Sequence, residues 1–386
     1  MISNTVTLAP SPKRYRQAVG AFFIILGVIF STWASRIPNI QGQLGLSDGA
    51  WGSVLFALPL GLLLGLPFSA WAVARLGSQI TLVAATLFHI ATLPFIGLAD
   101  NSWQLMIVLF FFGLSGNLIN VAVNTQAVAV EAMYKRSIMA SFHGLWSLAG
   151  FAGAAIGALF ISLKIAPWIH FCVIGVLVLG LLILAYRYTL ADRSTSQEKQ
   201  KVFVMPDRQL LGLGFIAFCG MICEGTMFDW SGIYFKKVVE VPDSYTAIGY
   251  VAFMCCMAAA RFVGDKLASK LGTFTMIQLN GLLVVCGLWL AVALPNIVAA
   301  TLGFMLVGLG VSTIVPLLYG ETGKTSTMAP GTAITAVSSV GFLGFLFGPP
   351  AIGYISEATN LRWAFAIVSL LGIGIILLSA RVKRKH

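Results

Sequence analysis

Twelve apolar stretches, each long enough to cross a lipid bilayer, follow one another along this chain with polar segments between them. A membrane-spanning helix needs about 20 mostly apolar residues. Because the bilayer interior offers no water to unpaired backbone groups, a chain with this many spans folds as a bundle of helices. The sequence therefore predicts an all-α membrane protein with twelve transmembrane helices. The expected helices cover approximately residues 16–36, 50–74, 79–98, 103–129, 138–162, 166–187, 209–234, 245–268, 274–294, 297–320, 332–356 and 362–381.

Charged residues are scarce, and their placement excludes one class of partner. Of the 386 residues, 58% are hydrophobic and 10% are charged, whereas soluble domains contain roughly 25% charged residues. The net charge of +11 would suit a nucleic-acid-binding protein. The basic residues, however, lie at the ends of the apolar stretches and are not gathered in an arm or a domain. We therefore expect the lipid bilayer, and no nucleic acid, as a partner.

The distribution of basic residues predicts how the helices cross the membrane. An even number of helices places both termini on one side. Nineteen of the 24 Lys and Arg residues, with Arg261 counted among them, fall at the ends and loops of that side. Because cytoplasmic loops carry the excess of basic residues, both termini are predicted to be cytoplasmic, in a bacterial inner membrane. The five basic residues expected on the opposite side are Arg36, Lys164, Lys236, Lys237 and Arg362.

Two short motifs recur at nearly the same separation. Residues 75–77 (Arg-Leu-Gly) resemble 270–272 (Lys-Leu-Gly), and Ala-Ile-Gly occurs at both 155–157 and 351–353. Chance recurrence in a sequence rich in Gly and Ala is the alternative to a duplication. Internal repeats of this length are common in secondary transporters. The expected domains are an N-terminal six-helix bundle (1–190), a cytoplasmic linker (191–208) and a C-terminal six-helix bundle (209–386).

Three amide side chains lie on one stripe of the fourth predicted helix. Asn117, Asn120 and Asn124 are spaced so that they share a face. Amides exposed to lipid would lack hydrogen-bond partners. The stripe is therefore predicted to line a polar cavity and to bind a solute, although hydrogen bonding between helices would satisfy the same side chains.

Two carboxylates occur in the seventh predicted helix. Glu224 and Asp229 are five residues apart, so about 140° separates them around an ideal helix. Glu224 is predicted to bind solute or to carry a proton, with a structural acceptor role as the alternative. Asp229 is predicted to pair with Arg36 of the first helix as an outer gate, with contact to the substrate as the alternative. Alternatively, Arg36 reaches the lipid headgroups and Asp229 bonds within its own helix.

Several other residues are candidates for binding, but nothing indicates an enzyme. His143 is a candidate proton relay or a packing residue, and Trp146 lies beside it. Tyr250 and Tyr319 have hydroxyls that could bind a ligand or lie at the membrane interface. The six cysteines lie in apolar runs without the spacing of a metal site or of disulfides. No catalytic constellation, metal site or cofactor motif is found.

Several segments together resemble the major facilitator superfamily of transporters, in particular its YbjJ-like branch, over essentially the whole chain. They are residues 33–38 (Trp-Ala-Ser-Arg-Ile-Pro), 120–124, 141–144, 224–225 with 229–230, 261–265 and 348–350. The resemblance implies the major facilitator fold, with two pseudo-symmetric six-helix bundles around a cavity. It also adds Trp33 to the substrate-binding candidates. Asp265 is implied to contact the inner end of the fifth helix around Ser137 as a further gate.

The branch is also similar to the fucose–proton symporters. That similarity implies acidic residues where this chain has Asn120 and Ala34, so Glu224, followed by His143, is the best remaining candidate for proton coupling. We expect a monomeric secondary transporter of a small, sugar-like polar solute that works by alternating access, with protons as the candidate coupling ion. The alternatives are a proton-driven exporter of drugs or metabolites and a transport-dead sensor or scaffold.

Overall fold

The computed structural model describes residues 11–134, 138–191, 208–325 and 330–383. Within these ranges the chain is almost entirely helical, and twelve spans are long and apolar enough to cross a membrane. The predicted all-α fold is therefore confirmed. The helices are α1 (Pro12–Gln43), α2 (Asp48–Leu55), α3 (Ala57–Leu76), α4 (Ser78–Leu98), α5 (Ser102–Glu131), α6 (Met139–Ser162), α7 (Pro167–Ala185), α8 (Arg208–Lys237), α9 (Ile248–Leu271), α10 (Thr273–Ala293), α11 (Ile297–Val311), α12 (Ile314–Thr325), α13 (Pro330–Ala358) and α14 (Leu361–Lys383).

Two of the twelve spans consist of two α-helices each. The second span is α2 followed by α3, with Phe56 between them, and the tenth is α11 followed by α12, with Ser312 and Thr313 between them. Interrupted helices are tolerated at membrane depth where the irregular backbone is buried in protein or lines a cavity. Both interruptions lie beside the central cavity described below, which is lined by Leu55, Ser312 and Thr313.

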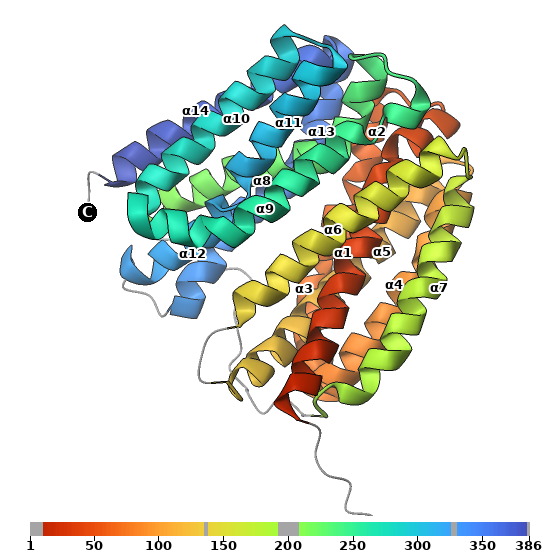
Figure 1. Cartoon of the computed structure of the whole chain (residues 1–386), viewed down its shortest axis with the longest axis vertical. Coiled ribbons are helices and arrows are strands. Elements are labelled where there is room, and N and C mark those ends of the chain that lie inside the picture. Colours follow the sequence, from red (N-terminus) through yellow and green to blue (C-terminus); the bar gives the residue numbers. More distant parts are fainter. Residues whose placement is uncertain (1–10, 135–137, 192–207, 326–329, 384–386) are drawn as a thin grey trace, which may run out of the picture.

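The helices form two bundles of equivalent construction (Figure 1). In the first bundle α1 packs on α6 and α3 packs on α5, and in the second α8 packs on α13 and α9 packs on α11. The glycines that end α3 and α9 also share a conformation, because Gly77 has φ +85° and Gly272 has φ +83°. Positive φ is costly for residues with a Cβ. The two copies of the Arg/Lys-Leu-Gly motif, at 75–77 and 270–272, therefore end equivalent helices in the same way.

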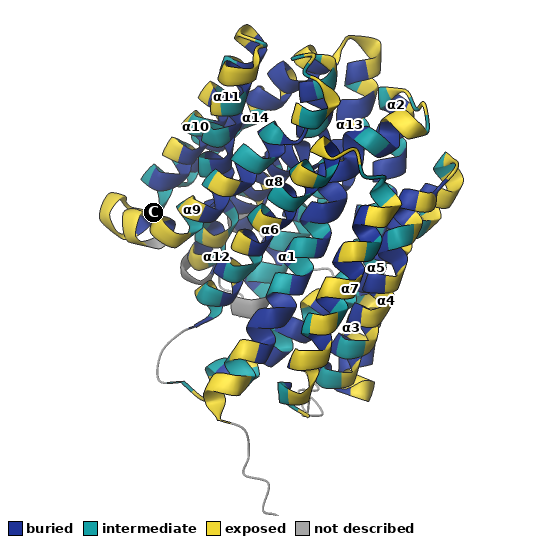
Figure 2. Ribbon diagram, turned by 45° about the vertical axis from the view of Figure 1, so that its right-hand side comes forward, coloured by how far each residue is buried: buried dark blue, intermediate teal, exposed yellow. Residues whose placement is uncertain are grey.

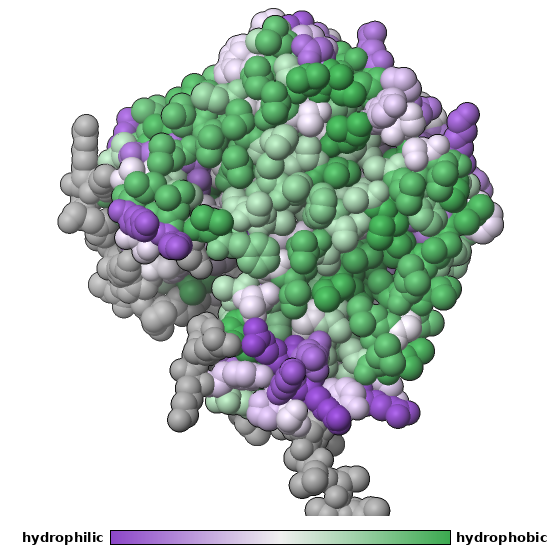
Figure 3. Space-filling model, viewed as in Figure 1, coloured by the Kyte–Doolittle hydropathy of each residue, from purple (hydrophilic) through white to green (hydrophobic). Residues whose placement is uncertain are grey.

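Most of the lateral surface is apolar. Figure 3 shows hydrophobic side chains across the middle of the molecule and hydrophilic ones toward its ends. Large apolar side chains such as Phe68, Trp71 and Leu184 are exposed on the outside, while the helix faces inside each bundle are buried (Figure 2). Apolar surface of this extent requires contact with lipid.

Two ends of the bundle are distinguished below by the helices that meet there. At the terminal end, α1 begins and α14 ends, whereas at the distal end α1 ends and α2 begins. The bundles contact each other mainly through α2 with α13, α6 with α9 and α1 with α8. Most of the predicted linker, residues 192–207, lies outside the described part of the chain.

Candidate functional site

A cavity of about 640 Å³ lies between the two bundles and receives side chains from both. It extends from the middle of the bundle toward the terminal end, where Ala140 of the first turn of α6 lines it. Six of the nine predicted substrate-binding residues line this cavity, namely Asn117, Asn120, His143, Trp146, Glu224 and Tyr319.

The amide stripe of α5 only partly faces the cavity. Asn117 is 6% exposed, and its Oδ1 accepts a hydrogen bond of 2.6 Å from Ser69 Oγ of α3. Asn120 is exposed to the cavity. Asn124 is not among the lining residues, but its amide donates to Asn120 Oδ1 at 3.0 Å and to the Asn120 carbonyl at 2.8 Å. Asn124 therefore orients Asn120, and the expectation that it faces the cavity is wrong.

Trp33 and Tyr250 lie outside the cavity lining. Each is 1% exposed. Trp33 packs against Trp51, with ring centroids 6.4 Å apart. Tyr250 shares a hydrogen bond of 3.0 Å with Ser31 Oγ. Both side chains are held by neighbouring helices, so the expectation that they contact solute from the cavity wall is corrected.

Arg261 of α9 was expected among the basic residues of the helix ends and loops, but it lies at the central cavity. It lines the cavity, and its guanidinium lies 3.4 Å from Glu224 Oε1. The same guanidinium donates to Ser147 Oγ of α6 at 2.7 Å and lies 5.3 Å from the centroid of the Trp146 ring. It also donates to the Ser312 carbonyl at 3.4 Å, where the tenth span is interrupted. One cation thus joins Glu224 in the second bundle to α6 in the first.

The signal for Arg261 was present in the sequence. It lies within the span Asp243–Gly264, well before the end of α9 at Leu271. An ionisable residue inside a span indicates a cavity or a charged partner. Counting Arg261 with the basic residues of the loops concealed that signal.

His143 and Tyr319, two further predicted binding residues, also line the cavity, and contacts with neighbouring side chains constrain their orientation. The His143 ring packs edge-on against Phe23, with centroids 5.3 Å apart, and the residue is exposed to the cavity. The Tyr319 hydroxyl accepts a hydrogen bond of 2.8 Å from Ser338 Oγ. Both groups are accessible to a solute while their orientation is constrained.

The predicted ion pair between Arg36 and Asp229 is not formed. Arg36 is 2% exposed and donates to the Ile165 carbonyl at 2.9 Å and to His170 Nδ1 at 3.1 Å. These partners lie in and before α7, so the guanidinium is bound within the first bundle. Asp229 lines the cavity on α8, and among the described residues it forms no hydrogen bond or ion pair. The predicted gate is therefore corrected.

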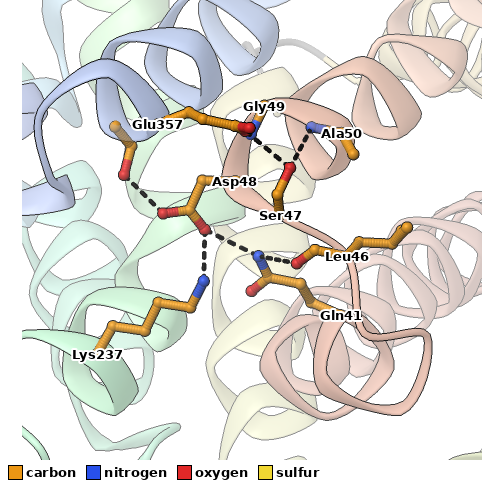
Figure 4. A network of polar contacts seen from close by, with 9 residues as sticks. Gln41, Leu46, Ser47, Asp48, Gly49, Ala50, Lys237 and Glu357 are labelled. Atoms are coloured by element: carbon orange, nitrogen blue, oxygen red, sulfur yellow. Dashed lines mark hydrogen bonds and ion pairs between the residues drawn. The ribbon is translucent and has the colours of Figure 1, made fainter.

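The bundles are joined at the distal end by a different polar cluster (Figure 4). Asp48 of α2 accepts hydrogen bonds from Lys237 Nζ of α8 at 2.6 Å and from Ser356 Oγ of α13 at 2.6 Å. Within the first bundle it also accepts from Gln41 at 2.9 Å. Glu357 Oε2 accepts from Ser47 Oγ at 2.7 Å and from the Gly49 amide at 2.6 Å. We call these six side chains the distal cluster: Gln41, Ser47, Asp48, Lys237, Ser356 and Glu357.

Close backbone packing between α2 and α13 accompanies the distal cluster. A Cβ added at Gly52 would lie 2.7 Å from the Pro349 carbonyl oxygen, and one added at Gly353 would lie 2.5 Å from the Asp48 carbonyl oxygen. Real Cβ atoms do not approach other atoms so closely, so glycine is required on both sides. The distal end is therefore closed by polar contacts and by direct helix packing.

One predicted gate cannot be placed at the level of side chains. Asp265 belongs to α9, but its side chain and the segment 135–137 around Ser137 lie outside the described part of the structure. No group of three or more His, Cys, Asp or Glu side chains that could hold a metal ion occurs in the described residues.

Comparison with known proteins adds relatives of similar length. The sequence model of the Major Facilitator Superfamily matches residues 18–326. An uncharacterized MFS-type transporter of Yersinia pestis is 31% identical over 349 residues, covering 90% of this chain and 91% of that protein. The uncharacterized transporter y4wD of Sinorhizobium fredii is 31% identical over 375 residues, covering 95% and 98%.

Among solved structures, the crystal structure of the nucleoside transporter NupG superimposes with a TM-score of 0.80. It is 11% identical and covers 95% of this chain and 99% of the NupG chain. At this identity the likeness concerns the fold alone.

Proposed function

The chain belongs to the Major Facilitator Superfamily, and from that premise we propose that it moves a small polar organic solute across the bacterial inner membrane by alternating access. The terminal end would face the cytoplasm, because the basic excess remains there after Arg261 is assigned to the cavity. The state described here would then be open toward the cytoplasm and closed at the distal end.

The observation that carries this proposal is the cavity shared by the two bundles. Asn117, Asn120 and His143 contribute polar groups from the first bundle, while Glu224 and Tyr319 contribute them from the second. A solute bound between two rigid bundles is accessible from one end at a time when the bundles rock about it. The distal cluster joins residues of both bundles, and separating those contacts would open the opposite path.

We propose that the Glu224–Arg261 pair couples this movement to protons. Arg261 is held both by Glu224 and, across the bundle interface, by Ser147. A proton bound to the Glu224 carboxylate would remove the negative charge that faces Arg261 and weaken the pair. The guanidinium could then shift relative to α6 or bind the solute. His143 lines the same cavity and is the second candidate for proton transfer.

A second candidate function is export of a drug or metabolite driven by protons. The same cavity contains several aromatic side chains, including Phe30, Phe228, Phe342 and Phe345. Aromatic and apolar linings accommodate larger and less polar ligands. A third candidate function is that of a membrane sensor that binds a solute and does not transport it.

A solute screen followed by transport measurements tests the proposal. Purified protein would be screened by thermal shift against sugars, amino sugars, nucleosides and hydrophobic cations, and the hits would be measured for uptake into proteoliposomes with an imposed pH gradient. Asn120→Ala should weaken binding of the hit by roughly tenfold, the loss expected for one or two hydrogen bonds. Gln43→Ala, which removes an exposed amide at the end of α1, serves as the control.

Binding and uptake of a polar solute, with binding sensitive to Asn120→Ala, would support the proposal. Binding only of large apolar compounds would favour the exporter. Binding without any transport in either direction would favour the sensor and contradict the proposal.

A further inference from the structure

A carboxylate without a partner faces the central cavity. Asp229 lines it from α8, and among the described residues it has no hydrogen bond or ion pair. Glu224, the other acidic side chain of the described lining, differs because Arg261 lies 3.4 Å from its carboxylate. A charged group that is removed from bulk water and has no partner is unfavourable. The Glu224 carboxylate is already paired with Arg261, whereas the Asp229 carboxylate is free to bind a cationic group of a ligand.

The formal charges of the cavity lining do not cancel. Arg261 is balanced by Glu224, so the lining carries one net negative charge when Asp229 is ionised. The chain as a whole has a net charge of +11. The charge of the cavity is therefore opposite in sign to the net charge of the protein. A negative cavity attracts a cationic ligand.

Aromatic rings share the cavity lining with the unpaired carboxylate. Phe228 precedes Asp229 in the chain and lines the same cavity, with its ring 5.1 Å from Phe30 in an edge-to-face arrangement. Trp146 lines the cavity from the first bundle and already contacts the Arg261 cation. Ring faces attract organic ammonium groups. A cavity with this lining therefore suits a cation that carries carbon substituents better than a hydrated metal ion.

From these observations we infer that the solute carries a protonated amine, which binds Asp229, while its hydroxyl groups bind the amides of Asn117 and Asn120. The inference rests on the proposed transport function and adds the chemical class of the solute: a small polyhydroxylated ammonium compound. Asp229 is thus assigned a substrate-binding role in place of the predicted gate.

Matched pairs of ligands test the charge requirement. Binding of glucosamine and galactosamine to the full-length protein would be measured by isothermal titration against glucose, galactose and N-acetylglucosamine. One charge-assisted hydrogen bond should make the ammonium sugars bind roughly tenfold to a hundredfold more tightly. Asp229→Asn should abolish this difference, while Asp100→Asn, the same substitution outside the cavity lining, should preserve it.

A second readout does not depend on the carbon skeleton of the ligand. A reporter cysteine at Asn120, in a variant without the six native cysteines, would be labelled with cationic and anionic methanethiosulfonate reagents. The ratio of cationic to anionic labelling rates should fall about tenfold in Asp229→Asn, because one unit of charge is lost from the cavity. If none of the sugars binds, this ratio alone decides.

Three results would overturn the inference: equal binding of the ammonium and neutral sugars, a preference for amines that survives Asp229→Asn, and an unchanged labelling ratio. Equal binding is also the result expected if Asp229 serves only to carry a proton. Neutral solutes that bind and are transported would overturn the ammonium requirement and leave the transport proposal intact. Selective binding of amines without transport would support the ammonium requirement and contradict the transport proposal.

Discussion

Replacing Asp48 by Asn would test whether the distal cluster holds the two bundles together. The Asp48 carboxylate accepts hydrogen bonds from Lys237 and Ser356, which both belong to the second bundle. Asn has the same shape and keeps one oxygen, but it loses the charge and presents an N–H₂ group to one of the former donors. The substitution therefore removes contacts between the bundles while leaving the fold of each bundle in place.

The contacts differ in their contributions. The Lys237 side chain is 41% exposed, so its ion pair with Asp48 contributes about 0–1 kcal/mol. Ser356 is 4% exposed, and its bond to the carboxylate contributes about 1.5–3 kcal/mol. The Asp48→Asn variant should therefore lose about 1.5–4 kcal/mol of the free energy that favours the distally closed state. That loss corresponds to roughly a 10- to 1,000-fold change in the ratio of closed to open molecules.

Electron paramagnetic resonance can measure this ratio. Spin labels at Gln43 and Thr359, exposed positions near the distal ends of α1 and α13, report the distance between the bundles. Asp48→Asn should add a longer-distance population. Asp243→Asn is the matched control, because Asp243 is an acidic residue of the same end whose partner, Lys236 at 3.3 Å, belongs to its own bundle.

The control should retain the distance distribution of the unmodified protein. If Asp48→Asn gives that same distribution, the distal cluster does not stabilise the closed state, and helix packing alone accounts for closure. If Asp243→Asn shifts the distribution as far as Asp48→Asn does, the response reflects general loss of negative charge at this end.

Three further predictions concern other parts of the molecule. Glu224→Gln should abolish pH-driven accumulation while solute binding persists, because Arg261 then lacks a titrating partner; uptake measured across a pH series checks this, and an unchanged pH dependence would remove Glu224 from coupling. Arg36→Ala should lower the free energy of unfolding by about 2–4 kcal/mol, since the Ile165 carbonyl loses its buried donor; an unaltered thermal midpoint would contradict this. Gly353→Ala should favour the distally open state by about 1–3 kcal/mol, because the added methyl group overpacks the contact between α2 and α13. Gly180→Ala, where the added Cβ has open space around it, should have no such effect. Equal distal accessibility of a reporter cysteine in the two variants would exclude the packing argument.

The spans of the fold could be predicted from sequence because hydropathy is a local property. The first predicted helix (16–36) lies inside α1 (Pro12–Gln43), and the last (362–381) lies inside α14 (Leu361–Lys383). The actual helices extend further at several ends, because polar residues at a bilayer interface can continue a helix without an energetic penalty. The break at Ser312 was not predicted, because hydropathy does not register Pro316, which lies in the first turn of α12 and has no N–H to continue the preceding helix.

The candidate site was only partly predictable, because its geometry depends on which helices meet. Spacing alone placed Asn117 and Asn120 on the cavity side of α5, but it could not distinguish them from Asn124, whose amide turns back to Asn120. The distal cluster was missed for a different reason. The Gly49 amide and Glu357 are 308 positions apart in the chain, and nothing local to either residue indicates the other.

The contact between Glu357 and the start of α2 couples the helix to the arrangement of the bundles. The first turn of any helix has N–H groups without partners inside the helix, together with a partial positive charge. In α2 this terminus is capped by Ser47, which donates in turn to a carboxylate of the other bundle, and the Gly49 amide bonds to the same carboxylate. Opening the distal end would leave the dipole of α2 without its counter-charge. Fraying of this turn, visible as faster amide hydrogen exchange at Gly49, would then accompany each opening of the distal end.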